Sequence, residues 1–141
     1  FRSGNTVLGA GGGLVGLEVA ELLAQRGRRV TVLEPSRDLG AELSLVRRWR
    51  VLHELASYQV ELLRNVEIDR IEPQSVYYSV DGEGRSVTAN QVIIAMGAQP
   101  DSSFFQQLNA LGIEAHAIGD CQQVSYIEGA MLSARQVAQS L

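Results

Sequence analysis

Gly11, Gly13, Gly16 and Glu34 are the residues whose types and spacing point to chemistry. The glycines fit the pattern G-x-G-x-x-G, and Glu34 follows the first of them at a separation of 23 residues, close to the roughly 20 of a dinucleotide-binding motif. In this register Gly11 allows a tight turn, Gly13 lets the backbone approach a diphosphate, and Gly16 lets a helix pack closely on a sheet. The pattern therefore predicts a dinucleotide site.

The residues beside the glycines refine this prediction. A helix that begins directly after the glycines would present its first amides, those of Leu14 and Val15, to the phosphates. Glu34 would accept hydrogen bonds from both ribose hydroxyls and repel a 2′-phosphate, which favours NADH over NADPH. Arg37 has two interpretations, a partner for a 2′-phosphate or a surface arginine. The same glycine pattern also serves FAD, so residues 1–40 leave the choice between NAD and FAD open.

The elements around these residues are the ones that would position such a site. Residues 5–10 and 29–34 are typical of buried strands, and the apolar spacing over residues 14–25 predicts a helix between them, which Gly27 ends. A second helix is expected over residues 41–57, with Val46, Trp49 and Leu55 at helical spacing and arginines on its solvated side. The other expected elements are strands near 59–65, 66–71, 75–80, 86–89, 91–96 and 114–118, and helices at 104–111 and 128–140.

The composition excludes several classes of protein. The 141 residues are 45% hydrophobic and 20% charged with a net charge of −4, which suits a compact domain and argues against a nucleic-acid partner. No apolar run reaches the roughly 18–20 residues of a membrane span. The single Cys121 cannot form an internal disulfide, so we expect a cytoplasmic protein. With two histidines and one cysteine no metal site is expected, and because all 12 basic residues are arginines a P-loop is excluded.

Four segments carry a resemblance to a known family: GGGLVGLEVAELLAQRGRRVTVLE at 11–34, QVIIAMGAQPD at 91–101, HAIGDC at 116–121 and IEGAMLSARQVAQSL at 127–141. In this order they resemble the C-terminal half of the NAD(P)H-dependent flavin oxidoreductases akin to 2,4-dienoyl-CoA reductase and 2-enoate reductase. More broadly, the chain is similar to the pyridine nucleotide–disulfide oxidoreductase superfamily. The resemblance covers nearly the whole chain.

The resemblance implies an α/β fold in two parts. Residues 1–98 would form a Rossmann-like NAD(P)H-binding domain with a parallel sheet and a β-meander crossover. Residues 99–141 would form a C-terminal strand–helix tail that resembles the end of an FAD-binding domain. Ala95 and Gly97 would lie on the nicotinamide side, and Asp120 would bind the ribityl chain of FAD. Glu18 is either an acid near the nicotinamide or a solvated helix residue.

The resemblance also implies a reaction, in which hydride passes from NADH to a flavin and the electrons pass on to a substrate elsewhere. The FAD domain and catalytic barrel of a parent protein would be partners, with FAD held only in the full-length protein. No catalytic residue is expected in this chain, which is expected to be a fragment that is inactive alone. Two alternatives stay open: a non-catalytic adenine-nucleotide-binding module, or FAD at the glycine motif. A homo-oligomer also stays open, because the apolar faces of the tail need burial.

Overall fold

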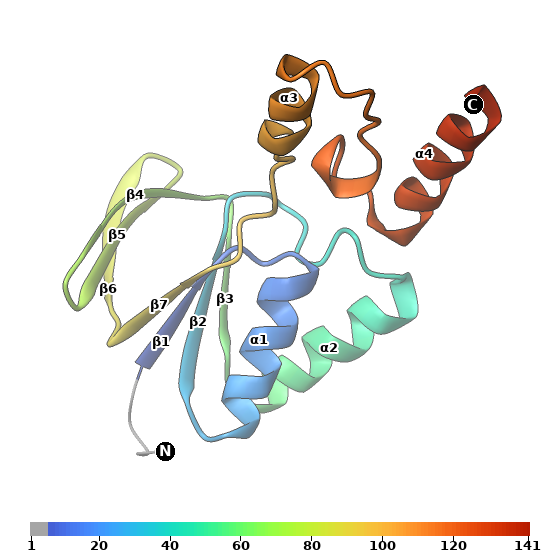
Figure 1. The fold of residues 1–141 in the computed structure, drawn as a ribbon. Helices are drawn as coiled ribbons and strands as arrows, with labels where there is room; N and C mark the ends of the chain where they lie inside the picture. Colours follow the sequence, from blue (N-terminus) through green and yellow to red (C-terminus); the bar gives the residue numbers. More distant parts are fainter. Residues whose placement is uncertain (1–5) are drawn as a thin grey trace. The chain divides into compact units, whose positions relative to one another are not determined.

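A four-stranded parallel sheet forms the centre of the first of two compact units. The computed structural model describes residues 6–141, with one unit ending at Gly97 and the other spanning Ala98–Leu141. The sheet has the strand order β3-β2-β1-β7 (Figure 1). Its strands are β1 (Thr6–Ala10), β2 (Arg29–Glu34), β3 (Glu61–Arg64) and β7 (Gln91–Ile94).

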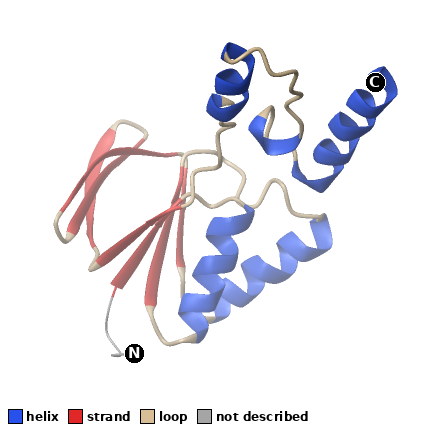
Figure 2. Ribbon diagram, in the orientation of Figure 1, coloured by secondary structure: helices blue, strands red, loops and turns tan. Residues whose placement is uncertain are grey.

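The parallel sheet is covered on both faces (Figure 2). Helices α1 (Leu14–Gln25) and α2 (Leu45–Ser57) pack on one face, and an antiparallel sheet of β4 (Val66–Glu72), β5 (Ser75–Val80) and β6 (Glu83–Thr88) packs on the other. Alternation along β2 shows why both faces are apolar: Val30 and Val32 belong to the core beneath the helices, and Leu33 belongs to the core beneath the meander. Parallel strands buried on both faces are rich in β-branched and apolar residues, and the buried Thr31 of β2 satisfies its hydroxyl by donating to Glu61 Oε2 at 3.1 Å.

The order of the strands creates a crevice at one end of the sheet. The chain passes from β1 through α1 to β2 and through α2 to β3, then returns through the meander to place β7 on the other side of β1. The direction of winding therefore reverses at β1. In open α/β sheets, ligands bind at this switch point, outside the carboxyl ends of the strands.

The sequence predicted the bounds of α1, β2 and β5, whereas α2 begins at Leu45, four residues later than expected. The expected orientation of α2 is confirmed for Leu55, which is buried, and is wrong for Val46 and Trp49. Val46 and Trp49 are 80% and 71% exposed. Arg47 lies instead toward α1, with Nη2 3.1 Å from Glu21 Oε2. The helix buries Val51 and Leu55, and at its N-terminal end Arg47 and Arg48 pair with Glu21 of α1 and Asp38 of the preceding loop.

The second unit contains helices α3 (Ser103–Ala110) and α4 (Tyr126–Ser140) and a short 3₁₀ helix, η1 (Gly119–Cys121). The strand expected at residues 114–118 is wrong: within residues 98–141 no segment pairs with it, and it runs as loop into η1. Ile118 keeps an extended backbone (φ −137°, ψ 156°), but a strand also requires a hydrogen-bonded neighbour. The loop is tied to α4 by the Gly119 N–H, which donates to Ser133 Oγ at 2.9 Å.

Residues 6–141 contain neither a helix that could span a membrane nor a side-chain cluster that could hold a metal ion. None of the helices in this range has both the length and the apolar character needed to cross a bilayer. No cluster of three or more histidine, cysteine, aspartate or glutamate side chains in the same range is arranged to hold a metal ion.

Two carboxylates meet where α1 packs on α2, and they make stability depend on pH. A hydrogen bond with Glu54, together with burial, raises the pKa of Glu21 above its ordinary value of 4.5. Glu21 therefore supports folding fully below pH 4.5, and this support is lost as the pH rises through the raised value. We expect Glu21→Gln, which is neutral at every pH, to have a higher Tm than the parent chain at neutral pH and an equal Tm below pH 4.5.

The measurement is thermal unfolding by circular dichroism across this pH range. Glu18→Gln is the matched control, because it removes the same charge from α1 and its carboxylate faces the same arginine, with Glu18 Oε1 3.8 Å from Arg47 Nη2. A Tm for Glu21→Gln that falls below the parent value at neutral pH would show that the ion pair with Arg47 outweighs the contact with Glu54.

Candidate functional site

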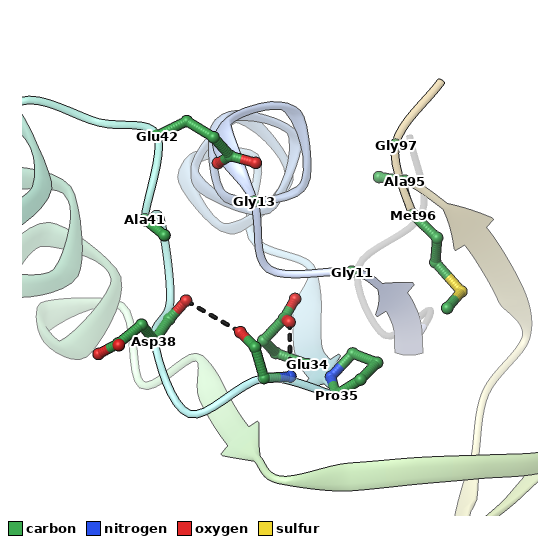
Figure 3. Close-up of a pocket in the computed structure, with 11 residues that line it drawn as sticks. Gly11, Gly13, Glu34, Pro35, Asp38, Ala41, Glu42, Ala95, Met96 and Gly97 are labelled. Atoms are coloured by element: carbon green, nitrogen blue, oxygen red, sulfur yellow. Dashed lines mark hydrogen bonds between the residues drawn. The ribbon is translucent and has the colours of Figure 1, made fainter. Parts of the chain in front are cut away.

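A cavity of about 240 Å³ lies at the carboxyl ends of β1, β2 and β7. It occupies the switch point of the sheet, and Figure 3 shows it between the glycine turn after β1 and the loop after β2. It is lined by Gly11, Gly13, Glu34, Pro35, Ser36, Asp38, Ala41, Glu42, Ala95, Met96 and Gly97. The topology therefore gathers at one place residues that are far apart in the sequence.

The glycine turn has the geometry that the spacing predicts. Gly11 has φ +107°, a conformation open to glycine, and a Cβ there would collide with the carbonyl of Ala95. Its N–H donates to Leu33 O at 2.8 Å. A Cβ on Gly16 would collide with the carbonyl oxygen of Gly11. The two glycines thus allow a tight turn and a close approach of α1 to the sheet.

Gly12 also has a packing role, which the sequence did not reveal. A Cβ on Gly12 would collide with the side chain of Leu39, which is buried in the loop after β2. The same loop is joined to the turn by the Gly40 N–H, which donates to Gly12 O at 2.8 Å. The turn and the loop therefore form one packed wall of the cavity.

The start of α1 faces an acidic side chain from that loop. Gly13 has an extended backbone (φ −73°, ψ −168°), and the helix begins at Leu14. The Leu14 N–H donates to Glu42 Oε2 at 3.0 Å, and Figure 3 shows the Glu42 carboxylate beside Gly13. The amides of Val15 and Gly16 follow within the first turn, where N–H groups have no intrahelical partner. No sequence pattern pointed to Glu42, because its position depends on the conformation of the loop.

Glu34 lies at the end of β2 with its carboxylate in the crevice. Its Oε2 accepts the Gly12 N–H at 2.6 Å, and its Oε1 accepts the Ser36 N–H at 2.8 Å. The residue is half-buried and lines the cavity. Each carboxylate oxygen has lone pairs for more than one donor. The two backbone bonds therefore fix the carboxylate in place and leave it able to accept hydroxyl groups.

The other predicted site residues are distributed over both units. Ala95 and Gly97 line the cavity together with Met96, directly after β7. Arg37 is exposed in the loop after β2 and is not among the lining residues. Asp120 is exposed in η1 of the second unit. The cavity thus brings together five of the predicted residues, Gly11, Gly13, Glu34, Ala95 and Gly97. The predicted Leu14, Val15 and Gly16 lie in the first turn of α1 and are not among the lining residues.

The groups around the cavity suit a ligand with a diphosphate and a sugar. Amides at a helix N-terminus bind anionic oxygens, and an anionic carboxylate, that of Glu42, lies beside Gly13 at this position. The fixed carboxylate of Glu34 accepts hydroxyl groups. The lining residues include no histidine, cysteine or arginine. This arrangement can bind and orient a nucleotide, and its own side chains offer no nucleophile other than carboxylates and a serine hydroxyl.

Comparison with known proteins shows that most of the chain is similar to proteins named as oxidoreductases. The sequence model of the pyridine nucleotide-disulphide oxidoreductase family matches residues 4–130. A bilirubin reductase of Mediterraneibacter gnavus is 36% identical over 122 residues, which cover 86% of this chain and 19% of the relative. An NADH oxidase of Thermoanaerobacter brockii is 30% identical over 141 residues, covering 98% and 22%. The chain therefore spans about a fifth of the length of these relatives.

The chain also shares its fold with solved structures. Histamine dehydrogenase from Rhizobium sp. 4-9 superimposes with a TM-score of 0.86 over 99% of this chain and 23% of its own, at 20% identity. This likeness concerns the α/β fold with its parallel sheet. The family match spans both the glycine turn and most of the second unit. The chain belongs to the pyridine nucleotide-disulphide oxidoreductase family.

Proposed function

We propose that the first unit binds NADH in preference to NADPH and positions it for hydride transfer to a flavin in a larger oxidoreductase. The observation that carries the proposal is the cavity at the switch point, where the glycine turn, the start of α1 and the Glu34 carboxylate converge. The match to the pyridine nucleotide-disulphide oxidoreductase family supports it.

The adenosine diphosphate half of the ligand accounts for most of the proposed contacts. The amides of Gly13, Leu14, Val15 and Gly16 would donate to the diphosphate at the positive end of α1. Gly11 shapes the turn that brings these amides to the cavity. Glu34 would accept the two ribose hydroxyls and would repel a 2′-phosphate. Arg37, which is exposed next to this loop, is the residue available to contact a 2′-phosphate.

The segment after β7 forms the other side of the cavity, where we place the nicotinamide. Ala95 and Gly97 line it, and the positive φ of Gly97 (+91°) turns the chain away at this point. When bound, NADH supplies the hydride. The role of this chain is to hold the ring in one orientation by packing against the backbone of residues 95–97. No side chain of the first unit is assigned a proton-transfer step.

The hydride acceptor and the electron acceptor are proposed to lie outside the first unit. We assign Asp120 to contact the ribityl chain of an FAD that other segments of the full-length protein would hold. The narrower family, that of the 2,4-dienoyl-CoA and 2-enoate reductases with their catalytic barrel, is also a proposal. It is supported by the order of four sequence segments and by relatives about five times as long as this chain.

The decisive experiment is a calorimetric titration of the chain with NADH, NADPH, ADP and FAD in parallel. NADH is expected to bind at least about tenfold more tightly than NADPH, which corresponds to 1.4 kcal/mol. ADP binding as tightly as NADH would instead favour a non-catalytic adenine-nucleotide module. FAD as the tightest ligand, with a yellow purified chain, would assign the glycine motif to the flavin.

Gly13→Ala tests the phosphate contact separately from folding. The backbone at Gly13 is extended, so alanine fits it, and the new Cβ would lie 3.1 Å from Oε1 of the flexible Glu42 side chain. The fold is expected to persist, while the methyl group occupies the face on which the diphosphate would lie. We expect NADH and ADP affinity to fall about tenfold, and adenosine affinity to stay constant.

The matched control is Gly84→Ala, because a Cβ there would meet nothing within 4 Å. Titration calorimetry gives the affinities, and circular dichroism shows whether the variants stay folded. Equal losses of ADP and adenosine binding in Gly13→Ala would place the adenosine, rather than the diphosphate, at this glycine.

A further inference from the structure

The carboxylate of Glu42 lies at the N-terminus of α1, where the proposed function would place a phosphate group. Glu42 Oε2 accepts the first amide of α1, that of Leu14, at 3.0 Å. The two carboxylate oxygens lie 3.1 and 3.2 Å from the point where a Cβ on Gly13 would stand. The space that the glycine leaves open is therefore taken by an anion of the protein itself.

The loop that carries Glu42 is anchored close to it, but the side chain is exposed. Leu39 is buried against the glycine turn, and the Leu43 N–H donates to Gly40 O at 3.0 Å. Between these anchors Glu42 belongs to the exposed residues, and it has no ion pair within the described part of the chain. The carboxylate can leave the helix by rotation of its own side chain, with the loop backbone in place.

Of the three carboxylates that line the cavity, Glu42 is the one that would compete with a phosphate group for the start of α1. Asp38, the third carboxylate of the lining, pairs with Arg48 at 3.1 Å, and Glu34 is held by two backbone amides. Glu42 is the carboxylate that rests on the helix N-terminus, where the dipole stabilises negative charge. A diphosphate that approaches the same amides meets this charge and has to displace it.

We propose that Glu42 is a specificity-determining residue that competes with the diphosphate for the N-terminus of α1 and so weakens binding of diphosphate ligands relative to nucleosides. The proposal rests on the proposed function, since it requires that a dinucleotide bind at this turn. Displacement of the carboxylate consumes part of the binding free energy of every ligand that places a phosphate at Leu14. A ligand without phosphates leaves the Glu42–Leu14 hydrogen bond intact.

The test is titration calorimetry on the full chain and on Glu42→Gln and Glu42→Ala, with adenosine, AMP, ADP and NADH as probes. Both variants are expected to bind ADP and NADH about threefold to tenfold more tightly than the parent chain, with adenosine affinity unchanged. Glu67→Gln, which changes the net charge equally from an exposed position on β4, is expected to bind all four ligands like the parent chain.

The outcomes separate the two proposals. If the parent chain binds ADP and both Glu42 variants bind it equally or more weakly, Glu42 acts only as a cap of α1 and the inference fails while the proposed function stands. If neither the parent chain nor any variant binds an adenine nucleotide, both fail. Thermal unfolding of each variant shows whether a loss of affinity comes from a loss of folded protein. The ratio of ADP affinity to adenosine affinity is the second readout, because a residue with a purely structural role would not change it.

Discussion

Gly16→Ala is expected to lower the free energy of unfolding by about 3 kcal/mol, at the upper end of the usual cost of overpacking. Helix propensity alone predicts the opposite, because alanine in a helix is about 1 kcal/mol more favourable than glycine. We expect the steric collision to outweigh helix propensity and to make the substitution destabilising. The added Cβ would collide with the carbonyl of Gly11, and the Ala95 Cβ would lie 3.6 Å from it. A carbonyl in a tight turn cannot move aside as the end of a side chain can.

The experiment compares Gly16→Ala with Gly9→Ala in thermal and urea unfolding. The same methyl group on Gly9 would meet its nearest atom, Val32 Cγ2, at 3.7 Å, an ordinary van der Waals contact. Since 1 kcal/mol corresponds to roughly 4–8 °C in a unit of this size, the Tm of Gly16→Ala should fall by at least about 10 °C, and that of Gly9→Ala by far less. Equal effects of the two substitutions would show that α1 can shift away from β1 at little cost.

The elements of the first unit could be predicted from the sequence where a local pattern and a packing requirement coincide. The run RVTVLE forms β2 at the predicted bounds because its four central residues are β-branched or apolar and are buried on both faces of the sheet. The helix after the glycines likewise begins and ends as expected, at Leu14 and Gln25. In both cases residues next to one another in the chain carry the whole signal.

Predictions failed where the outcome depends on a distant partner. Residues 114–118 have the composition of a strand, yet no neighbouring strand in the second unit completes a ladder. Trp49 follows the helical spacing of an apolar stripe, but ion pairs between α2 and α1 turn it to the exposed face, where it stacks on His53 with ring centroids 5.7 Å apart. Periodicity indicates a helix but does not determine which side the rest of the fold covers.

The residues of the candidate site also fall into two groups, those with a local sequence signal and those whose position depends on a distant part of the chain. Gly11, Gly16 and Glu34 could be predicted because the spacing of a glycine turn and a strand-end acid is fixed by the strand–helix–strand unit between them. Glu42 and Leu39 could not, because they reach the turn through a loop whose path is set by the burial of one leucine against Gly12. Of the segments that line the cavity, the loop after β2 is the one whose conformation could be predicted least from the sequence.

Glu34→Ala is expected to weaken NADH binding by about 30-fold, which corresponds to roughly 2 kcal/mol and to the loss of a charge-assisted hydrogen bond to ribose. NADPH should lose much less, because the substitution also removes the repulsion between the carboxylate and a 2′-phosphate. The ratio of NADH to NADPH affinity should therefore fall by about the same factor. Titration calorimetry with both dinucleotides measures this ratio directly.

Two structural features of Glu34 determine the controls. Its carboxylate accepts the N–H groups of Gly12 and Ser36, so alanine leaves these donors without their acceptor and lowers stability by about 1 kcal/mol; affinities are compared well below the Tm of each variant. Glu61→Ala removes a carboxylate from the same sheet, where it accepts a hydrogen bond from Thr31 Oγ1 at 3.1 Å, away from the lining of the cavity. It should leave both affinities unchanged. A parent chain that binds NADPH more tightly than NADH would assign the loop after β2 to recognition of the 2′-phosphate, with Arg37 in place of Glu34 as the residue that selects the ligand.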